Sequence, residues 1–337
     1  MACPCFYFRN LLILKKSFKV RLPSFSDIQA AHSRIKPFIH RTPVLSSLQI
    51  NKIFDCEIFL KCENFQKVGA FKFRGATNAV LQLPGKDRIN GVITHSSGNH
   101  AAAVTLAAVT NGIKAYIVMP ENAPVVKKNA VAGYGANITF CKPTQKDREE
   151  TTERIISETG ATLIHSYDNF NVICGQGTAA IELLEEKPDL DMIIVPVGGG
   201  GLISGIVTAS KGISPSITVF GAEPVNANDA YRSFTSGKLV PSVNPLTIAD
   251  GLLTSLSDRT FHIIRNNVDN IFTVTEESII ECMLLVWERM KIIIEPSSAT
   301  TLAVIKENPQ VFKGKRTGLI ITGGNVDLRK LPFNQIS

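Results

Sequence analysis

The 337-residue sequence lacks any charge surplus over most of its length. Five of its positive charges precede the first acidic residue, Asp27, and the rest of the chain holds 31 basic and 29 acidic residues. A chain so nearly neutral has no electrostatic reason to bind a polyanion, so we expect no nucleic-acid partner. With 44% hydrophobic and 19% charged residues, the composition excludes disorder and is typical of a globular protein of about two domains.

Cysteines are few, scattered and odd in number, which excludes a disulfide framework and favours reduced thiols in an intracellular enzyme. They are Cys3, Cys5, Cys56, Cys62, Cys141, Cys174 and Cys282. The C-x-C of Cys3 and Cys5 has no second pair or histidine at zinc-finger spacing. The six histidines show no metal-binding spacing either, so the sequence gives no reason to expect a zinc site.

Long apolar runs are also missing. Leu11–Leu14 is far shorter than the roughly 20 residues that span a bilayer. Met192–Ser210 contains no charge over 19 residues, but Pro196 and four consecutive glycines interrupt it. We therefore expect a buried strand, turn and helix there, and no membrane span.

The first 23 residues are basic and contain no acid, with Phe, Tyr and Leu interspersed. Such a segment is either a simple tail or an organelle presequence, and its scarcity of serine and arginine favours a tail. We accordingly expect a cytoplasmic protein, with a mitochondrial location as the alternative.

From Ser24 onward, short apolar runs alternate with segments of helical period. A helix is expected to begin near Phe25, capped by Ser24 or Ser26. Such alternation predicts an α/β fold with parallel sheets covered by helices on both faces. The expected strands are Ile58–Lys61, Gly91–Thr94, Ala115–Met119, Asn137–Cys141, Thr162–His165, Met192–Val197, Thr218–Ala222, Ile271–Val274 and Gly318–Thr322. The expected helices include His100–Asn111, Arg148–Thr159, Gly177–Glu186, Glu276–Lys291 and Ala299–Glu307.

Three glycine-containing loops each follow a predicted strand directly. They are Ser96-Ser97-Gly98-Asn99-His100, Gly198-Gly199-Gly200-Gly201-Leu202 and Thr322-Gly323-Gly324-Asn325. Ligands of open α/β sheets bind at the carboxyl ends of the strands. The three loops therefore predict one shared binding pocket.

The tetraglycine loop, Gly198–Gly201, is expected to bind phosphate, because its N–H groups and the following helix N-terminus can both approach an anion. It matches neither GxxxxGK[ST] nor GxGxxG. Gly175–Ala180 fits the looser GxGxxA, but the run before it, Val172–Cys174, is ill-matched to a strand. We interpret Gly175–Ala180 as a helix N-terminus rather than a dinucleotide site.

Lys72 lies between Phe71 and Phe73 among small residues. A lysine in an apolar setting loses solvation, its pKa falls, and its amine can attack a carbonyl. The alternative is a lysine whose stem lies on the surface with its charge in water, and the local sequence alone favours that alternative.

The order of these motifs resembles fold-type II pyridoxal-phosphate enzymes, most closely the serine/threonine dehydratase family, which includes the serine racemases. The resemblance rests on Lys72 in FKFRGA, followed by SSGNH, GGGGL and TGGN, and it extends from about Ser24 to Leu331. It implies a two-domain fold like that of the tryptophan synthase β chain. Residues 91–168 would form a small domain inserted into a large cofactor-binding domain made of residues 24–90 and 169–337, after a tail of residues 1–23.

The same resemblance implies pyridoxal 5′-phosphate (PLP) as cofactor. Lys72 would bond to its aldehyde, Phe71 would pack beside its ring, and Asn99 would hydrogen-bond its 3′ oxygen. The hydroxyl partner of the pyridine nitrogen falls on Thr322, where relatives usually carry serine. The remaining cofactor-binding positions are Gly198, Gly199, Gly200, Gly201, Leu202 and Gly251.

Ser97 distinguishes subfamilies by resemblance. Racemisation needs a proton donor and acceptor on each face of the α-carbon. Lys72 would serve one face and Ser97 the other, whereas bacterial threonine dehydratases typically carry alanine there. A serine that merely contacts the substrate carboxylate is the alternative. Other expected substrate contacts are Ser96, Gly98, His100 and Arg148, and for Arg148 the alternative is a charge on the surface of a helix.

Two further sites follow from the resemblance alone. Glu223, Asp229 and the carbonyl of Ala227 match a divalent-cation site suited to Mg²⁺, Ca²⁺ or Mn²⁺. Positions that bind ATP at a dimer interface in mammalian-type relatives fall on Lys67, Tyr134, Lys291 and Asn325. The chain departs from those relatives at Val68, where they have threonine, and at Ala102, where they have glutamine, which argues against a nucleotide response. A homodimer is expected.

The implied activity is interconversion of L- and D-serine, with β-elimination of serine to pyruvate and ammonia and a corresponding reaction of threonine to 2-oxobutanoate. The alternative within the family is an L-threonine/L-serine dehydratase without significant racemase activity. A catalytically silent descendant would show damage at Lys72 or the glycine loop, and both are intact. A dinucleotide-dependent oxidoreductase is a more distant alternative.

Overall fold

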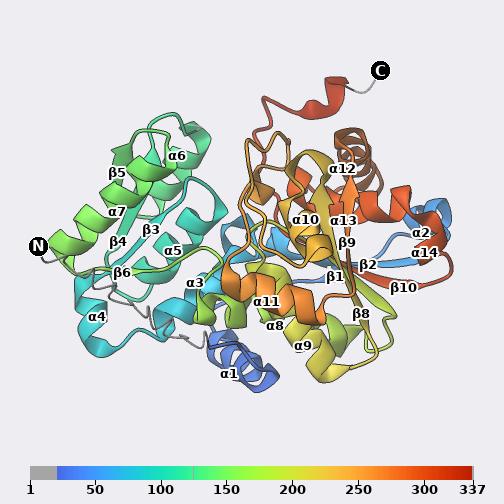
Figure 1. The fold of residues 1–337 in the computed structure, drawn as a ribbon, viewed down its shortest axis with the longest axis horizontal. Coiled ribbons are helices and arrows are strands. Elements are labelled where there is room, and N and C mark those ends of the chain that lie inside the picture. The colour runs from blue at the N-terminus through green and yellow to red at the C-terminus, as the bar shows by residue number, and fades with distance from the viewer. Residues whose placement is uncertain (1–20, 124, 336–337) are drawn as a thin grey trace, which may run out of the picture.

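The computed structural model describes residues 21–123 and 125–335 (Figure 1). Most of the basic N-terminal segment, including Cys3, Cys5 and Leu11–Leu14, lies outside the described residues. Ser24 caps the first helix as expected: its side chain accepts a hydrogen bond from the backbone N–H of Asp27, and the Asp27 carboxylate accepts one from the N–H of Ser24.

The larger sheet has six strands in the order β1-β2-β10-β7-β8-β9. All neighbouring pairs are parallel except β1 and β2, which are antiparallel. The strands are β1 (Val44–Leu45), β2 (Glu57–Cys62), β7 (Met192–Pro196), β8 (Thr218–Pro224), β9 (Asn270–Val274) and β10 (Arg316–Ile321). The two-residue strand β1 was not predicted.

The smaller sheet is fully parallel, with the order β5-β4-β3-β6. Its strands are β3 (Val92–His95), β4 (Ala115–Pro120), β5 (Asn137–Cys141) and β6 (Thr162–Leu163). Figure 1 shows the two sheets side by side, the smaller one on the left. Each sheet is surrounded by helices, so the predicted α/β architecture with parallel sheets flanked by helices is confirmed.

Fourteen α-helices occur among the described residues. They are α1 (Phe25–Ile35), α2 (Leu48–Phe54), α3 (Lys72–Leu81), α4 (Gly85–Asn90), α5 (Asn99–Val109), α6 (Val125–Gly133), α7 (Gln145–Thr159), α8 (Phe170–Glu186), α9 (Gly201–Ile213), α10 (Asp229–Ser236), α11 (Asp258–Asn267), α12 (Glu276–Met290), α13 (Pro296–Glu307) and α14 (Pro309–Phe312). None of them is long and apolar enough to cross a membrane.

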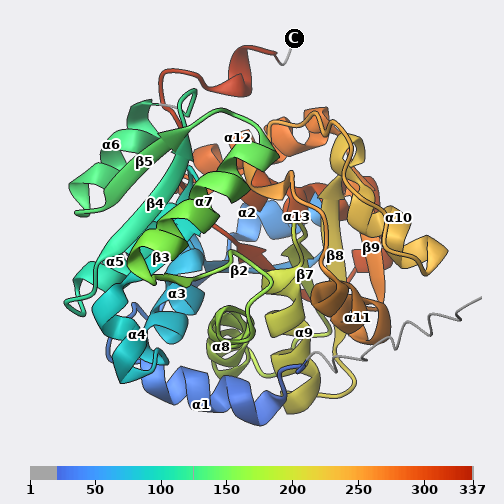
Figure 2. The same cartoon turned by 60° about the vertical axis from the view of Figure 1, so that its left-hand side comes forward.

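Helices cover both faces of the six-stranded sheet, and strand β7 shows why its sequence is continuously apolar. Ile193 and Val195 belong to the hydrophobic core that includes residues of α8 and α9. Ile194 belongs to the core on the other face, with residues of α12 and α13. Figure 2 shows α8 and α9 on the opposite side of β7 from α12 and α13. Successive side chains of a buried parallel strand point to opposite faces of the sheet, and each face needs apolar residues.

Gly175 and Gly177 lie in the interior of α8, so our interpretation of Gly175–Ala180 as a helix N-terminus is wrong. The helix begins at Phe170 and is capped by the Asn169 side chain. A Cβ on Gly175 would lie 2.6 Å from the carbonyl oxygen of Arg74, and one on Gly177 would lie 2.6 Å from that of Gly205. These glycines permit close packing of α8 against α3 and α9, and the position inside a helix excludes a dinucleotide loop.

Candidate active site

The first and third predicted loops meet directly. Asn99, at the start of α5, accepts a hydrogen bond at 2.9 Å from the side-chain amide of Asn325, which follows β10. The Asn99 side-chain nitrogen in turn lies 3.1 Å from a carboxylate oxygen of Glu295. These contacts join the small sheet to the large one at the carboxyl ends of β3 and β10.

Glu295 is the buried carboxylate at this junction. Thr322 donates to it at 3.4 Å, and the Thr322 hydroxyl also lies 2.9 Å from that of Ser298. Burial raises the pKa of Glu295 to about 7, opposed by the hydrogen bond from Asn99. Thr322, which the resemblance assigns to the cofactor site, thus has its hydroxyl in a buried hydrogen-bonded cluster.

The tetraglycine loop leads from β7 into α9 and requires its glycines. Gly200 has a φ of +82°, which side-chain-bearing residues rarely adopt. A Cβ on Gly199 would lie 2.3 Å from the ring of Tyr167, and one on Gly198 would lie 3.0 Å from the Gly251 carbonyl oxygen. No side chain caps the N-terminus of α9. Its first N–H groups therefore have no side-chain acceptor, as an anion-binding helix start requires.

Gly251 links this loop to the other two. Its N–H donates to the hydroxyl of Ser297 at 3.2 Å. Ser297 adjoins Ser298, which contacts Thr322. The three loops that the sequence analysis assigned to one pocket are therefore connected through a continuous set of contacts.

Lys72 is the first residue of α3 and lies at this meeting point. The N–H of the preceding residue, Phe71, donates to the Thr322 carbonyl at 2.9 Å. The Lys72 amine donates to the carbonyl of Ser166 at 3.1 Å and lies 4.9 Å from the centre of the Phe71 ring. Burial lowers the pKa of Lys72 to about 8, against an opposing effect of the Glu295 charge. Lys72 is thus not the solvent-directed lysine that its local sequence favoured.

The remaining expected substrate residues occupy the N-terminal side of α5 and the start of α7. Ser96, Ser97 and Gly98 are half-buried in the loop after β3. His100 is buried, and burial, reinforced by the charge of Lys72, lowers its pKa to about 3. Its Nε2 lies 2.9 Å from the carbonyl oxygen of Ile164. Since a carbonyl only accepts, Nε2 carries the proton and the imidazole is neutral.

Arg148 lies on α7, and its Nε is buried without a hydrogen-bond partner among the described residues. Burial lowers the pKa of His95, and the nearby charge of Arg148 contributes to that lowering. The His95 ring packs edge-on against His165, with ring centres 6.1 Å apart. His95, at the end of β3, thus contacts the segment that holds Ser166, the residue bound by Lys72.

Sequence reasoning assigned no role to three residues that shape this site: Glu295, Ser166 and Tyr167. Tyr167 covers the glycine loop and packs edge-on against His165 at 4.6 Å. Glu295 had a detectable signal, because it is a lone acid directly after the apolar run Ile292–Ile294. Ser166 contributes only its backbone carbonyl, which no side-chain pattern reveals.

The expected cation-binding residues are close together beyond β8. The Glu223 carboxylate accepts hydrogen bonds from the N–H groups of Ala230 at 2.9 Å and Tyr231 at 2.8 Å. Asp229 is buried at the start of α10, and Ala227 is buried two residues before it. Burial raises the pKa of Glu223 to about 8 and that of Asp229 to about 6. No group of three or more His, Cys, Asp or Glu side chains arranged for a metal occurs in the described part of the chain.

Three of the four expected nucleotide-binding residues surround Val68. Asn325 donates to the Val68 carbonyl at 2.7 Å, Tyr134 belongs to the same small core as Val68, and Lys67 precedes it. The Lys67 amine is bound to the Phe38 carbonyl at 2.6 Å. Lys291 follows the last residue of α12 and has a left-handed backbone conformation.

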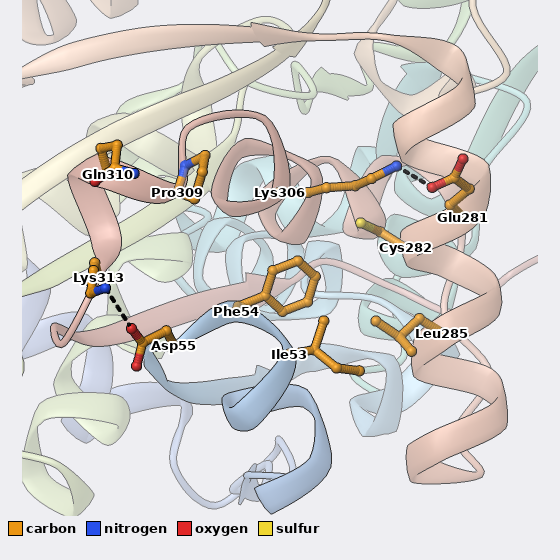
Figure 3. A pocket seen from close by; sticks show the side chains of 10 residues that line it. All are labelled: Ile53, Phe54, Asp55, Glu281, Cys282, Leu285, Lys306, Pro309, Gln310 and Lys313. Atoms are coloured by element: carbon orange, nitrogen blue, oxygen red, sulfur yellow. Dashed lines mark hydrogen bonds and ion pairs between the residues drawn. The ribbon is translucent and has the colours of Figure 1, made fainter.

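A cavity of about 560 Å³ lies elsewhere, between α2, α12 and α14 (Figure 3). Ion pairs of Lys306 with Glu281 and of Lys313 with Asp55 lie at its edge. Asp55 precedes β2 and Lys313 precedes β10, so this cavity lies at the amino ends of those strands. The candidate site lies at the carboxyl ends, so the two are distinct.

Comparison with known proteins agrees with this geometry. The profile of the family described as "Pyridoxal-phosphate dependent enzyme" matches residues 35–323. The chain belongs to this family and is a PLP-dependent enzyme.

Individual relatives within this family include racemases and dehydratases of amino acids. The serine racemase of Dictyostelium discoideum is 51% identical over 314 residues, which cover 91% of this chain and 96% of that protein. The β-hydroxyaspartate dehydratase of Paracoccus denitrificans is 48% identical over 313 residues, covering 93% and 99%. The structure of maize serine racemase has a TM-score of 0.90 and 44% identity, covering 92% of this chain and 95% of that one.

The residues present fit PLP. The glycine loop provides backbone N–H groups at an uncapped helix start for its phosphate. Lys72 provides an amine whose lowered pKa keeps a substantial neutral fraction near pH 8, which attack on an aldehyde requires. When bound, PLP withdraws electrons from the α-carbon of an attached amino acid and so acidifies the hydrogen on that carbon.

Proposed function

We propose that the protein is a serine racemase that also eliminates water from serine, giving pyruvate and ammonia. The observation that carries the proposal is the contact of the Lys72 amine with the Ser166 carbonyl, next to Tyr167, which covers the glycine loop. The 51% identity to a serine racemase supports serine as substrate. The family's reaction of threonine to 2-oxobutanoate is proposed as a side activity.

Lys72 and Ser97 divide the proton transfers in this proposal. Lys72 takes the α-proton of L-serine, and the carbonyl of Ser166 orients its amine. Ser97 returns a proton from the other face, which yields D-serine. The buried neutral His100 lies three residues after Ser97 and gives this turn a rigid attachment to Ile164.

The test is to incubate the purified protein with L-serine and PLP and to measure D-serine and pyruvate in the same samples. The proposal expects both products. Pyruvate without D-serine would support the L-threonine/L-serine dehydratase alternative. Neither product from L-serine would contradict the assignment of serine as substrate.

Elimination of water from 3-hydroxyaspartate is a second candidate function. It is favoured by Arg148, whose buried Nε lacks a partner and for which no ion pair is found within residues 21–123 and 125–335. A second carboxylate on the substrate would pair with such a guanidinium. The similarity to a β-hydroxyaspartate dehydratase points the same way.

The two candidates differ in their dependence on Arg148. For 3-hydroxyaspartate, Arg148→Met should raise KM or lower kcat/KM by tenfold or more, since a charge-assisted pair contributes about 1.5–3 kcal/mol. For serine the change should be below about threefold. Arg154→Met, on the exposed side of the same helix, is the control. Equal effects of Arg148→Met on both substrates would remove the argument for a dicarboxylate.

We also propose that Mg²⁺ or a similar hard cation binds Glu223, Asp229 and the Ala227 carbonyl. The burial of two neighbouring carboxylates, Glu223 at 1% and Asp229 at 2% exposure, supports this, because a cation offsets the cost of burying their charges. Such a cation would stabilise the folded protein without touching the substrate.

Finally, we propose a homodimer formed through the surface next to Lys67. The exposed apolar side chains Phe38, Phe65 and Ile293 gather there: Lys67 binds the Phe38 carbonyl, and Asn64, beside Phe65, binds the Ile293 carbonyl. Light scattering after size-exclusion chromatography should give twice the chain mass. Phe65→Asp should shift that mass toward one chain, and an unchanged mass would place the interface elsewhere.

A further inference from the structure

Four charged side chains are buried beneath α3, the helix that begins with Lys72. Lys61 on β2, Glu63 just after it and Arg74 on α3 have no exposed surface, and Glu182 on α8 is 2% exposed. Two cations and two carboxylates make the set neutral. Such a set is unusual, because these residue types are almost never fully buried unless paired.

Arg74 is the centre of this network and binds both carboxylates through two nitrogens each. Its Nε and Nη2 donate to Glu63 at 2.7 and 2.9 Å, and its Nη1 and Nη2 donate to Glu182 at 2.8 and 2.7 Å. Burial alone would raise the pKa of Glu182, but Arg74 and then Lys61 bring it down to about 2. The carboxylate is therefore ionised, and the planar guanidinium holds it in a fixed orientation.

Arg74 and Lys72 lie two positions apart in the first turn of α3. At 100° per residue their side chains leave nearly opposite faces of the helix. The Lys72 amine contacts Ser166, whereas the Arg74 guanidinium contacts η1 (Glu63–Phe65) and α8 on the far side. Fixing Arg74 therefore fixes the direction in which Lys72 leaves the helix.

The first turn of α3 depends on contacts outside the helix. No side chain caps its N-terminus, and a ten-residue helix is marginal without tertiary contacts. Two further backbone hydrogen bonds hold this turn: the Phe71 N–H donates to the Thr322 carbonyl, and the Gly75 N–H donates to the Gln176 side chain on α8 at 3.2 Å. The attachment at Phe71 precedes Lys72 and those at Arg74 and Gly75 follow it, so Lys72 is held from both sides in the sequence.

We infer that Arg74 is a positioning residue for the reaction, whose paired bonds to Glu63 and Glu182 hold Lys72 in register with the cofactor and the α-carbon. The inference rests on the proposed function only in taking Lys72 as the reacting lysine. Stability alone does not explain the network, since buried ion pairs are commonly no more stabilising than apolar residues of the same volume. The two bidentate pairs fix the orientation of Arg74 and, through the helix, that of Lys72.

The test compares Arg74→Lys with Lys61→Met. Lysine keeps the charge of Arg74 but cannot bind two carboxylates bidentately. Lys61 belongs to the same network and binds Glu182 and the Thr42 carbonyl, but it lies on β2 and its loss leaves the four Arg74 bonds in place. Both variants should lower the melting temperature. Measurements are made where circular dichroism shows both variants to be folded.

The first readout is independent of turnover: the rate at which added PLP becomes fixable to Lys72 by borohydride, measured by mass spectrometry of the Lys72 peptide. Arg74→Lys should slow this rate and lower kcat by about tenfold to a hundredfold, as expected for a misplacement near 1 Å, with KM changed much less. Lys61→Met should stay within about threefold of wild type. Because fixation of PLP does not depend on the amino-acid substrate, this readout remains valid if serine proves to be the wrong substrate.

Wild-type fixation and kcat in Arg74→Lys would overturn the inference, as would equal losses in the two variants, which would indicate a purely structural network. If Arg74→Lys does not fold, Glu63→Gln replaces it. The amide keeps the shape of the side chain but weakens one of the two pairs. It should slow fixation by at least about threefold at unchanged PLP saturation, and no slowing would contradict the inference.

Discussion

The Lys72 amine lies 3.1 Å from the carbonyl oxygen of Ser166, the residue that immediately precedes Tyr167, whose ring covers the tetraglycine loop. One short segment thus contacts both the amine proposed to react and the loop proposed to bind the cofactor's phosphate. A displacement of this segment would disturb both functions together.

The pH dependence of cofactor attachment tests the environment of Lys72. Only the neutral amine attacks the aldehyde, so the attachment rate to apoprotein should rise with pH and level off above about pH 8. A lysine with the ordinary pKa of 10.5 would show a rate still rising beyond pH 9. Stopped-flow absorbance measures the rate, with Lys72→Ala as the control that should not attach PLP.

The same lowered pKa predicts a stability effect in the apoprotein. The unfolded chain binds a proton at Lys72 up to about pH 10.5, whereas the folded chain releases it near pH 8, so the folded state gains stability between these values as pH rises. Lys72→Met should therefore raise the free energy of unfolding below pH 8, and the gain should shrink toward pH 10.5. Urea titrations at pH 7 and pH 10 measure it, and an equal gain at both would contradict the burial of a charged amine.

Substitutions in the glycine loop should show whether Gly199 is required because a Cβ there would collide with the Tyr167 ring. Gly199→Ala places a Cβ about where the Tyr167 ring lies, 2.3 Å away, so PLP affinity should fall by tenfold or more. Gly85→Ala is the matched control, because a Cβ there meets nothing within 4 Å. Adding Tyr167→Ala to Gly199→Ala should recover part of the affinity. Fluorescence titration with PLP gives the affinities, and no recovery would mean that Tyr167 is not the obstacle.

Removal of divalent cations should lower thermal stability, because a ligand that binds only the folded state stabilises it. At Mg²⁺ a hundredfold above Kd the expected stabilisation is about 2.7 kcal/mol. Glu223→Gln should abolish the Mg²⁺-dependent shift in melting temperature, whereas Glu281→Gln, at an exposed ion pair on α12, should retain it. A shift that persists in Glu223→Gln would place the cation elsewhere.

The sequence predicted those elements whose ends are determined by residues nearby in the chain. The expected strand at Asn137–Cys141 coincides with β5, and the three loops follow β3, β7 and β10 as anticipated. Lys72 was the ambiguous case, since its immediate neighbours favoured a surface position. Only the order of distant motifs corrected that reading.

What could not be predicted depends on tertiary contacts. Gly175 and Gly177 have the spacing of a ligand loop, yet their absence of side chains serves helix packing against Arg74 and Gly205. The Arg74 network joins residues up to 121 positions apart, and no local pattern pairs Lys61 with Glu182. The proximity of these residues is a result of folding and cannot be predicted from a local pattern in the sequence.

The most direct test of the account follows the α-proton. Wild-type protein and Ser97→Ala are incubated with L-serine in deuterated water, and the deuterium in each serine enantiomer is measured together with pyruvate. The account predicts deuterated D-serine and pyruvate from wild type. Ser97→Ala should keep L-serine elimination while its D-serine formation falls by about 10²- to 10⁴-fold, the usual cost of losing a positioned acid or base. If both reactions fall by the same factor, or if Ser97→Ala still forms D-serine at the wild-type rate, then Ser97 does not serve the second face and the assignment of a two-residue racemase is wrong.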